Sequence, residues 1–129
     1  MSSQHPEMRS FEEFWPYYVR AHSNKVNRSL HFAGTTAGAA LVAAGILTLR
    51  PSLVLAGPVV GYGCAWIGHF FVEGNVPASF GHPWWSFKAD WVMWKKILEG
   101  TMDDEVERVL RDAAPAPKGT NGRPTEQPS

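Results

Sequence analysis

The chain of 129 residues lacks the features of several protein classes. Its 12 basic and 12 acidic residues balance, so the excess positive charge typical of nucleic-acid-binding proteins is missing. The one cysteine, Cys64, has no other cysteine to pair with and is expected to pack as a small apolar residue. The first residues contain neither a basic start nor an early apolar run, so no cleavable signal peptide is expected. We therefore expect a single domain without a nucleic-acid partner.

Acidic and basic residues are also absent from two long segments, residues 29–49 and 51–72. A helix of either length rises about 30 Å, the thickness of the hydrocarbon core of a bilayer. The mean hydropathy of the chain is slightly negative at -0.21, because a polar tail dilutes two very apolar blocks. The sequence predicts an all-α membrane protein with one transmembrane helical hairpin, spanning about residues 29–49 and 52–73, and amphipathic interfacial helices.

An amphipathic segment precedes the hairpin, at about Phe11 to Arg20. Ser10 and Glu13 have the spacing of a capping box at its start, and Pro16 is expected to kink the helix or shift where it begins. The aromatic and charged residues of the segment suit the headgroup layer. We therefore expect this helix to lie on the membrane.

A second amphipathic segment, Trp84 to Leu98, follows the hairpin. Its tryptophans form one stripe and its lysines lie away from it, which is typical of helices in the membrane interface. Gly100 ends this helix, and a short charged helix is expected to about Asp112. Residues 113–129 have no apolar periodicity, so we expect a disordered tail after a single helical membrane domain of residues 1–112.

Basic residues gather at one end of the predicted hairpin. They are Arg20, Lys25, Arg28, Lys88, Lys95 and Lys96, whereas the hairpin tip has Arg50 alone. By the positive-inside rule, both termini are expected to face the cytoplasm.

Four of the five histidines converge on that same end. His31 lies early in the first apolar segment and His69 late in the second, so antiparallel packing brings both to one membrane depth. His22 and His82 lie on the connections that flank the hairpin. Imidazole nitrogens suit iron, zinc, copper and nickel, and histidines with a carboxylate and open positions suit Fe(II) oxygen chemistry. We therefore predict a metal site built from three or four of these histidines.

Both predicted membrane helices have a face of small residues. The stripes comprise Gly34, Thr35, Gly38, Val42 and Gly45 in the first helix and Gly57, Gly61, Cys64 and Gly68 in the second. Small residues mark the side on which membrane helices pack, so His31, which shares the first stripe, is expected to point at protein and not at lipid. The same faces could join copies of the chain into a homo-oligomer.

Two carboxylates are candidates for the site. Glu73 follows His69 by four residues, so the two side chains should meet on one helix face. Glu73 is then a metal ligand, a group that orients His69, or a helix-end carboxylate in a salt bridge. Asp90 falls within an apolar stripe and needs a partner, either near the metal or in an ion pair with Arg28 or Lys25.

Two motifs carry a resemblance to a known family. Residues 22–34 have the pattern H-x-N-x-x-N-x-x-x-H-x-x-G, and residues 68–78 have the pattern G-H-x-x-x-E-x-x-x-P-A. In these motifs the chain resembles the membrane family that includes the fungal 2-hydroxy fatty acid dioxygenase of phytosphingosine breakdown. The resemblance runs from about Phe11 to Leu98. The fungal members have further hydrophobic segments after the second motif, where this chain has one interfacial helix.

The resemblance implies an enzyme of the endoplasmic reticulum or a bacterial membrane that uses Fe(II) and O2 to shorten a 2-hydroxy fatty acid by one carbon. The matching candidates are His22, His31, His69 and Glu73, whereas the assignment of His82 as a ligand rests only on topology. For a chain this short we expect the bacterial inner membrane. The partners are then the fatty-acyl substrate, O2 and the lipid bilayer, and Arg28 or Lys25 could hold the substrate carboxylate by charge-assisted hydrogen bonds.

Two other functions fit the same residues. In a haem-binding membrane protein, His31 and His69 would be axial ligands across the hairpin. In a non-enzymatic membrane adaptor or lipid-binding protein, the histidines would only contact headgroups.

Overall fold

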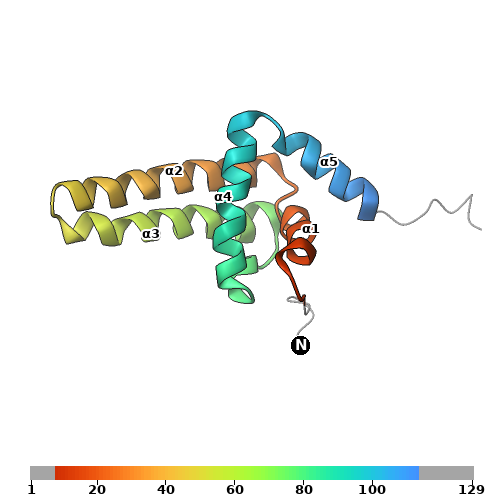
Figure 1. Ribbon diagram of the computed structural model, residues 1–129, viewed down its shortest axis with the longest axis horizontal. Helices are drawn as coiled ribbons and strands as arrows, with labels where there is room; N and C mark the ends of the chain where they lie inside the picture. The colour runs from red at the N-terminus through yellow and green to blue at the C-terminus, as the bar shows by residue number, and fades with distance from the viewer. Residues whose placement is uncertain (1–7, 114–129) are drawn as a thin grey trace, which may run out of the picture.

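The computed structural model describes residues 8–113, which form helices and their connections. The elements are α1 (Phe11–Ala21), α2 (Lys25–Leu47), α3 (Pro51–Ile67), the π-helix η1 (Gly68–Glu73), the 3-10 helix η2 (Ala78–Phe80), α4 (Pro83–Glu99) and α5 (Met102–Ala113). Figure 1 shows α2 and α3 as a long hairpin, with α4 lying across its base and α1 and α5 gathered beyond that end. The predicted all-α membrane architecture is confirmed.

Within residues 8–113, two helical segments are long and apolar enough to cross a membrane, Lys25–Leu47 and Pro51–Glu73. Only 22% and 17% of the residues in their most apolar stretches are buried, whereas a core helix of a soluble protein would be mostly covered. The first begins four residues before its predicted start, because the Asn24 side chain caps it by accepting a hydrogen bond from Val26 N at 2.8 Å.

The hairpin is held together by the predicted faces of small residues. A Cβ atom added at Gly38 would lie 2.7 Å from the carbonyl oxygen of Gly57, and one at Gly57 would lie 2.6 Å from the carbonyl oxygen of Gly38. The two backbones therefore approach as closely as glycine permits. These glycines contact each other within one chain, so a homo-oligomer stays a prediction and would need another surface.

A hydrophobic cluster at the base of the hairpin joins α1, α4 and α5. Its members are buried and include Phe14, Tyr18, Val19, Ala89, Met93, Met102, Val106 and Val109. The aromatic residues of α1, expected to face the headgroups, thus pack largely against α4 and α5. The cluster fixes α1, and with it the chain that leads into the hairpin.

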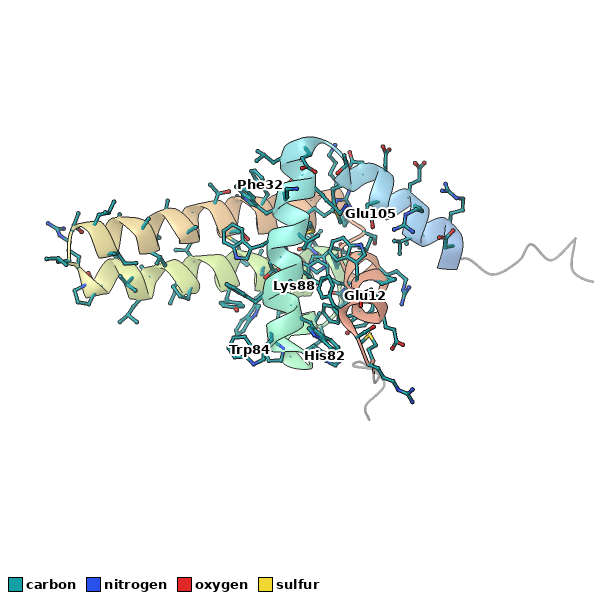
Figure 2. All side chains as sticks on the ribbon, in the orientation of Figure 1. Glu12, Phe32, His82, Trp84, Lys88 and Glu105 are labelled. Atoms are coloured by element: carbon teal, nitrogen blue, oxygen red, sulfur yellow. The ribbon has the colours of Figure 1, made fainter. Side chains whose placement is uncertain are left out.

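The buried face of α4 is not the stripe of tryptophans that the sequence suggested. The buried residues of α4 are Ser86, Ala89 and Met93, whereas Trp84 and Phe87 are exposed. The packed face of α4 therefore consists of Ser86, Ala89 and Met93, and exposed aromatic rings are what the membrane interface favours. Figure 2 shows Trp84 projecting from the end of α4 at which the helix begins.

Three smaller predictions have mixed outcomes. The Ser10 hydroxyl caps α1 by accepting from Glu13 N at 3.2 Å, but the Glu13 carboxylate accepts from Arg9 N and so does not complete the capping box. Pro16 lies inside α1 without moving its start. Helix α5 reaches Ala113, one residue past the predicted end, and the rest of the predicted tail, residues 114–129, lies outside the described residues.

Candidate metal centre

Three buried histidines from three elements meet at the base of the hairpin. His22 ends α1, His31 lies in the second turn of α2 and His69 lies in the π-helix η1. One ring nitrogen of each lies within 4.8 Å of those of the other two. The ring centroids are 4.4, 4.5 and 5.0 Å apart and the ring planes are nearly perpendicular in pairs. Three ring nitrogens from three elements thus lie close enough together to bind one metal ion.

The π-helix presents His69 to the other two rings. Its wider turn is a local departure from the α-helix that is often found at functional sites. It ends at Gly74, whose φ of 73° is left-handed and favours glycine, and this turn lets Asn75 N donate to the His69 carbonyl at 2.9 Å. Gly68 at its start contacts the Asn27 side chain, where a Cβ atom would collide.

Arg28 fixes the connection that bears His22. Its guanidinium Nη1 donates to the carbonyls of His22 at 2.9 Å and Ser23 at 2.8 Å, and Nη2 donates to Asp103 Oδ1 at 2.9 Å. The Arg28 side chain is 8% exposed. This buried cation therefore ties the end of α1 to α2 and to α5.

Hydrogen bonds determine which nitrogen of His22 and His31 carries the proton. His22 Nδ1 lies 2.6 Å from the carbonyl of Tyr18, and His31 Nδ1 lies 3.1 Å from the carbonyl of Asn27. A carbonyl oxygen only accepts, so both Nδ1 atoms donate. In the neutral rings the Nε2 atoms are then unprotonated, and each has a lone pair that can bind a metal ion.

The same holds for His69. Its Nδ1 lies 2.7 Å from Asn75 Oδ1, and the Asn75 amide is oriented because its Nδ2 donates to the Ala21 carbonyl at 3.1 Å. His69 Nδ1 is therefore the donor and its Nε2 is bare. All three imidazoles have the oriented outer hydrogen bond that metal-bound histidines usually make.

These bare nitrogens fit a metal ion. His22 Nε2 and His31 Nε2 are 3.1 Å apart, so two lone pairs face each other with no proton between them. Metal–imidazole bonds of about 2.0–2.1 Å place two ligand nitrogens on one ion about 3 Å apart. The pKa of His22 is held well below its ordinary value, mainly by burial and secondly by electrostatic interaction with His31 and His69. This ring is therefore in the neutral form that binds a metal ion.

A small cavity of about 20 Å³ adjoins the triad. Polar side chains in its lining include Tyr18, Ser86 and Asp90. The Tyr18 hydroxyl donates to Asp90 Oδ1, and burial raises the pKa of the Asp90 carboxyl to about 7. The Ser86 hydroxyl is buried and has no hydrogen-bond partner among the described residues. This space suits one ion or water.

The predicted fourth ligand, His82, does not join the triad. Its ring stacks on Trp85 at 5.1 Å between centroids and meets the Phe14 ring edge-on at 5.5 Å. His82 is the N-cap residue of α4, at the end of that helix shown in Figure 2, and this position turns the ring toward the aromatic cluster on α1.

Glu73 does not contact His69 as the four-residue spacing predicted. Glu73 Oε2 accepts instead from Asn24 N at 2.6 Å and from Asn27 Nδ2 at 3.3 Å. Glu73 is the last residue of the π-helix, and its carboxylate lies against the start of α2. Asn75, and not Glu73, therefore orients His69.

The ion pair of Asp90 with Arg28 or Lys25, one of its two predicted alternatives, is not formed among the described residues. Arg28 pairs with Asp103, to which Lys25 Nζ is also close at 3.6 Å, because α5 folds back over the start of α2. Arg28 uses three of its five N–H donors on Asp103 and two carbonyls, and its contact with a substrate carboxylate stays a prediction. Asp90 has Tyr18 as its partner instead.

Sequence reasoning overlooked Tyr18, Asn75 and Ser86. Helical spacing could have indicated two of them, since Tyr18 precedes His22 by four residues and Ser86 precedes Asp90 by four. Asn75 lies just past the end of the π-helix. Its link to His69 depends on the left-handed turn at Gly74, which the spacing does not reveal.

A haem ligated by His31 and His69 does not fit this arrangement. Their ring centroids are 5.0 Å apart, and the His22 ring contacts both. A planar macrocycle between the two imidazoles would have to displace the third.

A family model matches most of the chain. The model of the Mpo1-like family, described as 2-hydroxy-palmitic acid dioxygenase Mpo1-like, matches residues 8–102. The match includes all three histidines of the triad and ends where α5 begins. No curated protein and no solved structure matches the chain.

Proposed function

The chain belongs to the Mpo1-like family, and from this premise we propose that it is an Fe(II)-dependent dioxygenase that shortens 2-hydroxy fatty acids by one carbon. The observation that carries the proposal is the triad of His22, His31 and His69, whose bare Nε2 atoms converge in a buried site. A resident metal ion would be held by these three nitrogens. Bound Fe(II) with open coordination positions supplies the electron-transfer chemistry that O2 needs in order to react with an organic substrate.

The polar edge of α4 is suited to the head of the substrate. Ser86 and Asp90 are one helical turn apart and both line the cavity beside the triad. The unpartnered Ser86 hydroxyl would donate to the substrate carboxylate, and Asp90 would accept from the 2-hydroxyl group. Tyr18, which donates to Asp90 Oδ1, leaves the other carboxyl oxygen for the substrate and holds the group in place. In this proposal Asp90 acts near the metal, and its partner is Tyr18 and not a cation.

Burial of the site keeps bulk water from the reacting groups. His22, His31 and His69 are 1%, 5% and 2% exposed, and the adjoining cavity has room for little beyond an ion or a water molecule. The substrate head therefore enters by displacing the contents of this cavity or by a small outward movement of α4. Exclusion of water also prevents side reactions of activated oxygen.

The two candidate membrane spans support a reaction at a bilayer surface. The triad lies where the hairpin meets α1 and α4, and Arg50 is at the opposite tip. We propose that the hairpin inserts into the bacterial inner membrane with both termini on the cytoplasmic side. The excess of basic residues at the triad end supports this orientation.

The reaction is tested with purified, iron-loaded protein, 2-hydroxyhexadecanoic acid and O2. We expect O2 consumption and a fatty acid shorter by one carbon, with turnover lost in Ser86→Ala and Asp90→Asn variants that retain iron. Hexadecanoic acid, without the hydroxyl, is the matched control substrate and should not react. Absence of a shortened product from fully loaded wild-type protein would overturn the proposal and leave a metal-binding membrane protein without this activity.

A further inference from the structure

A second cavity, much larger and more apolar, runs along the seam of the hairpin. Its volume is about 430 Å³, within the range of small-molecule sites. On α2 the lining extends from His31 to Ile46, on α3 from Gly57 to Ala65, and α4 covers one end with Phe87, Asp90 and Trp91. Glycines and alanines leave this space open, because glycine has no side chain and the side chain of alanine is a single methyl group.

This groove is continuous with the metal centre. His31, Tyr62, Ala65 and Asp90 line both the groove and the small cavity beside the triad. A ligand could therefore have one end beside the histidines and the remainder along the hairpin. Nothing in the proposed function requires such a connection, so the groove is a separate observation.

The polar groups of the groove are unevenly distributed. His31, Tyr62 and Asp90 lie toward the triad, whereas the far end is formed by Val42, Ala43, Ile46 and Pro58. Such a gradient matches a molecule with one polar head and one aliphatic tail. A helix rises about 22 Å over the 15 residues from His31 to Ile46, and one lipid chain spans half of a bilayer core, about 15 Å. The groove is thus long enough for one acyl chain.

We propose that this groove binds the acyl chain of the substrate, with the head at the triad and the chain end toward the hairpin tip. The inference rests on the proposed function and adds the site that selects chain length. Because the groove faces the bilayer along the spans, the acid enters sideways from the membrane, passing between α4 and the hairpin. Val42 and Ile46 set the length of chain that fits.

Photolabelling of the loaded protein in lipid nanodiscs tests the site directly. The probe is 2-hydroxyhexadecanoic acid with a diazirine at the far end of its chain, and mass spectrometry locates the labelled peptide. We expect labelling around Val42 to Ile46 that excess unlabelled 2-hydroxyhexadecanoic acid suppresses. Even labelling of outward-facing residues such as Leu55 and Val59, unaffected by competitor, would overturn the inference.

Two variants change the groove in opposite directions. Ala43→Phe fills its far half, so the relative affinity for the 16-carbon over a 10-carbon 2-hydroxy acid should fall about tenfold, as expected for a few displaced methylene groups. Ile46→Ala lengthens the groove and should shift the preference toward longer chains. Ala40→Phe is the control, since Ala40 is exposed on α2 but does not line the groove. Unchanged chain-length preference in both groove variants would contradict the proposal.

The proposed acyl-chain site and the proposed reaction can be disproved independently of each other. Saturable labelling of Val42 to Ile46 without O2 consumption or product would support the acyl site and overturn the dioxygenase. A shortened product together with labelling that is spread over the lipid-facing surface would support the dioxygenase and overturn the acyl site.

Discussion

The amide of Asn75 joins two parts of the candidate site. Its oxygen accepts from His69 Nδ1 and its nitrogen donates to the Ala21 carbonyl at the end of α1. One side chain therefore orients a metal-ligand candidate and also ties the π-helix to the helix that bears His22. The structure brings together three of the four predicted histidine ligands. Hydrogen bonds to neutral carbonyl and amide oxygens decide where each of these rings points, and the spacing of the histidines in the sequence does not reveal them.

At the same scale, Asp90 makes stability depend on pH. Its carboxyl has a folded-state pKa of about 7 because of burial, against 3.8 in the unfolded chain. Between these values the folded state holds a proton that the unfolded state releases. The contribution of protonated Asp90 to the free energy of unfolding is on the order of 4 kcal/mol. It is fully present below about pH 4 and is lost as the pH rises to about 7.

Comparison with Asp90→Asn isolates this effect, since the amide does not titrate. We expect the stability of metal-free wild type relative to the variant to fall steadily from pH 4 to pH 7 and to stay level above it. Thermal unfolding in detergent measures the difference, and all other titrating groups are common to both proteins. A difference that stays constant over this range would show that Asp90 is ionised in the folded protein throughout.

At the scale of elements, absence of charge and periodicity of small residues predicted the hairpin and its packing face well. Both depend on local composition, which a single sequence shows directly. The π-helix was not predictable in this way, because one extra residue in a turn leaves no signature in Gly68 to Glu73. Glu73, at the end of this π-helix, accepts hydrogen bonds from Asn24 and Asn27 and does not contact His69.

The close contact of α2 and α3 makes Gly57 intolerant of a side chain. A Cβ atom there would lie 2.5 Å from Val42 Cγ2 and 2.6 Å from the Gly38 carbonyl oxygen, so Gly57→Ala must push the helices apart. We expect a loss of about 2 kcal/mol in the free energy of unfolding, as is typical of overpacking. Reversible unfolding of the protein in mixed detergent micelles gives the value.

Gly63→Ala is the matched control on the same helix. A Cβ atom there meets nothing within 4 Å, and alanine is the better helix former by about 1 kcal/mol. The control should therefore be neutral or slightly stabilising. Equal destabilisation by both substitutions would mean that the glycine face does not hold the hairpin together.

At the scale of the whole molecule, the hairpin and the helices at its base have separate tasks. The hairpin provides the membrane spans, the groove and two histidines, and α1 brings the third histidine to them. Helix α5 contributes Asp103, the partner of Arg28, from 75 residues further along the chain. Such long-range pairing is not visible in the sequence, in which Arg28 or Lys25 is a candidate partner both for the substrate carboxylate and for Asp90.

The most direct test of the account is the iron content of detergent-purified protein after anaerobic reconstitution with Fe(II). Wild type is compared with His22→Ala, His31→Ala and His69→Ala, and His82→Ala is the control for loss of a histidine outside the triad. We predict one iron per chain in wild type and in His82→Ala, loss of iron in each triad variant, and no haem absorption in any sample. Iron that persists in the triad variants, or that is absent from reconstituted wild type, would contradict the metal centre on which the proposed function rests.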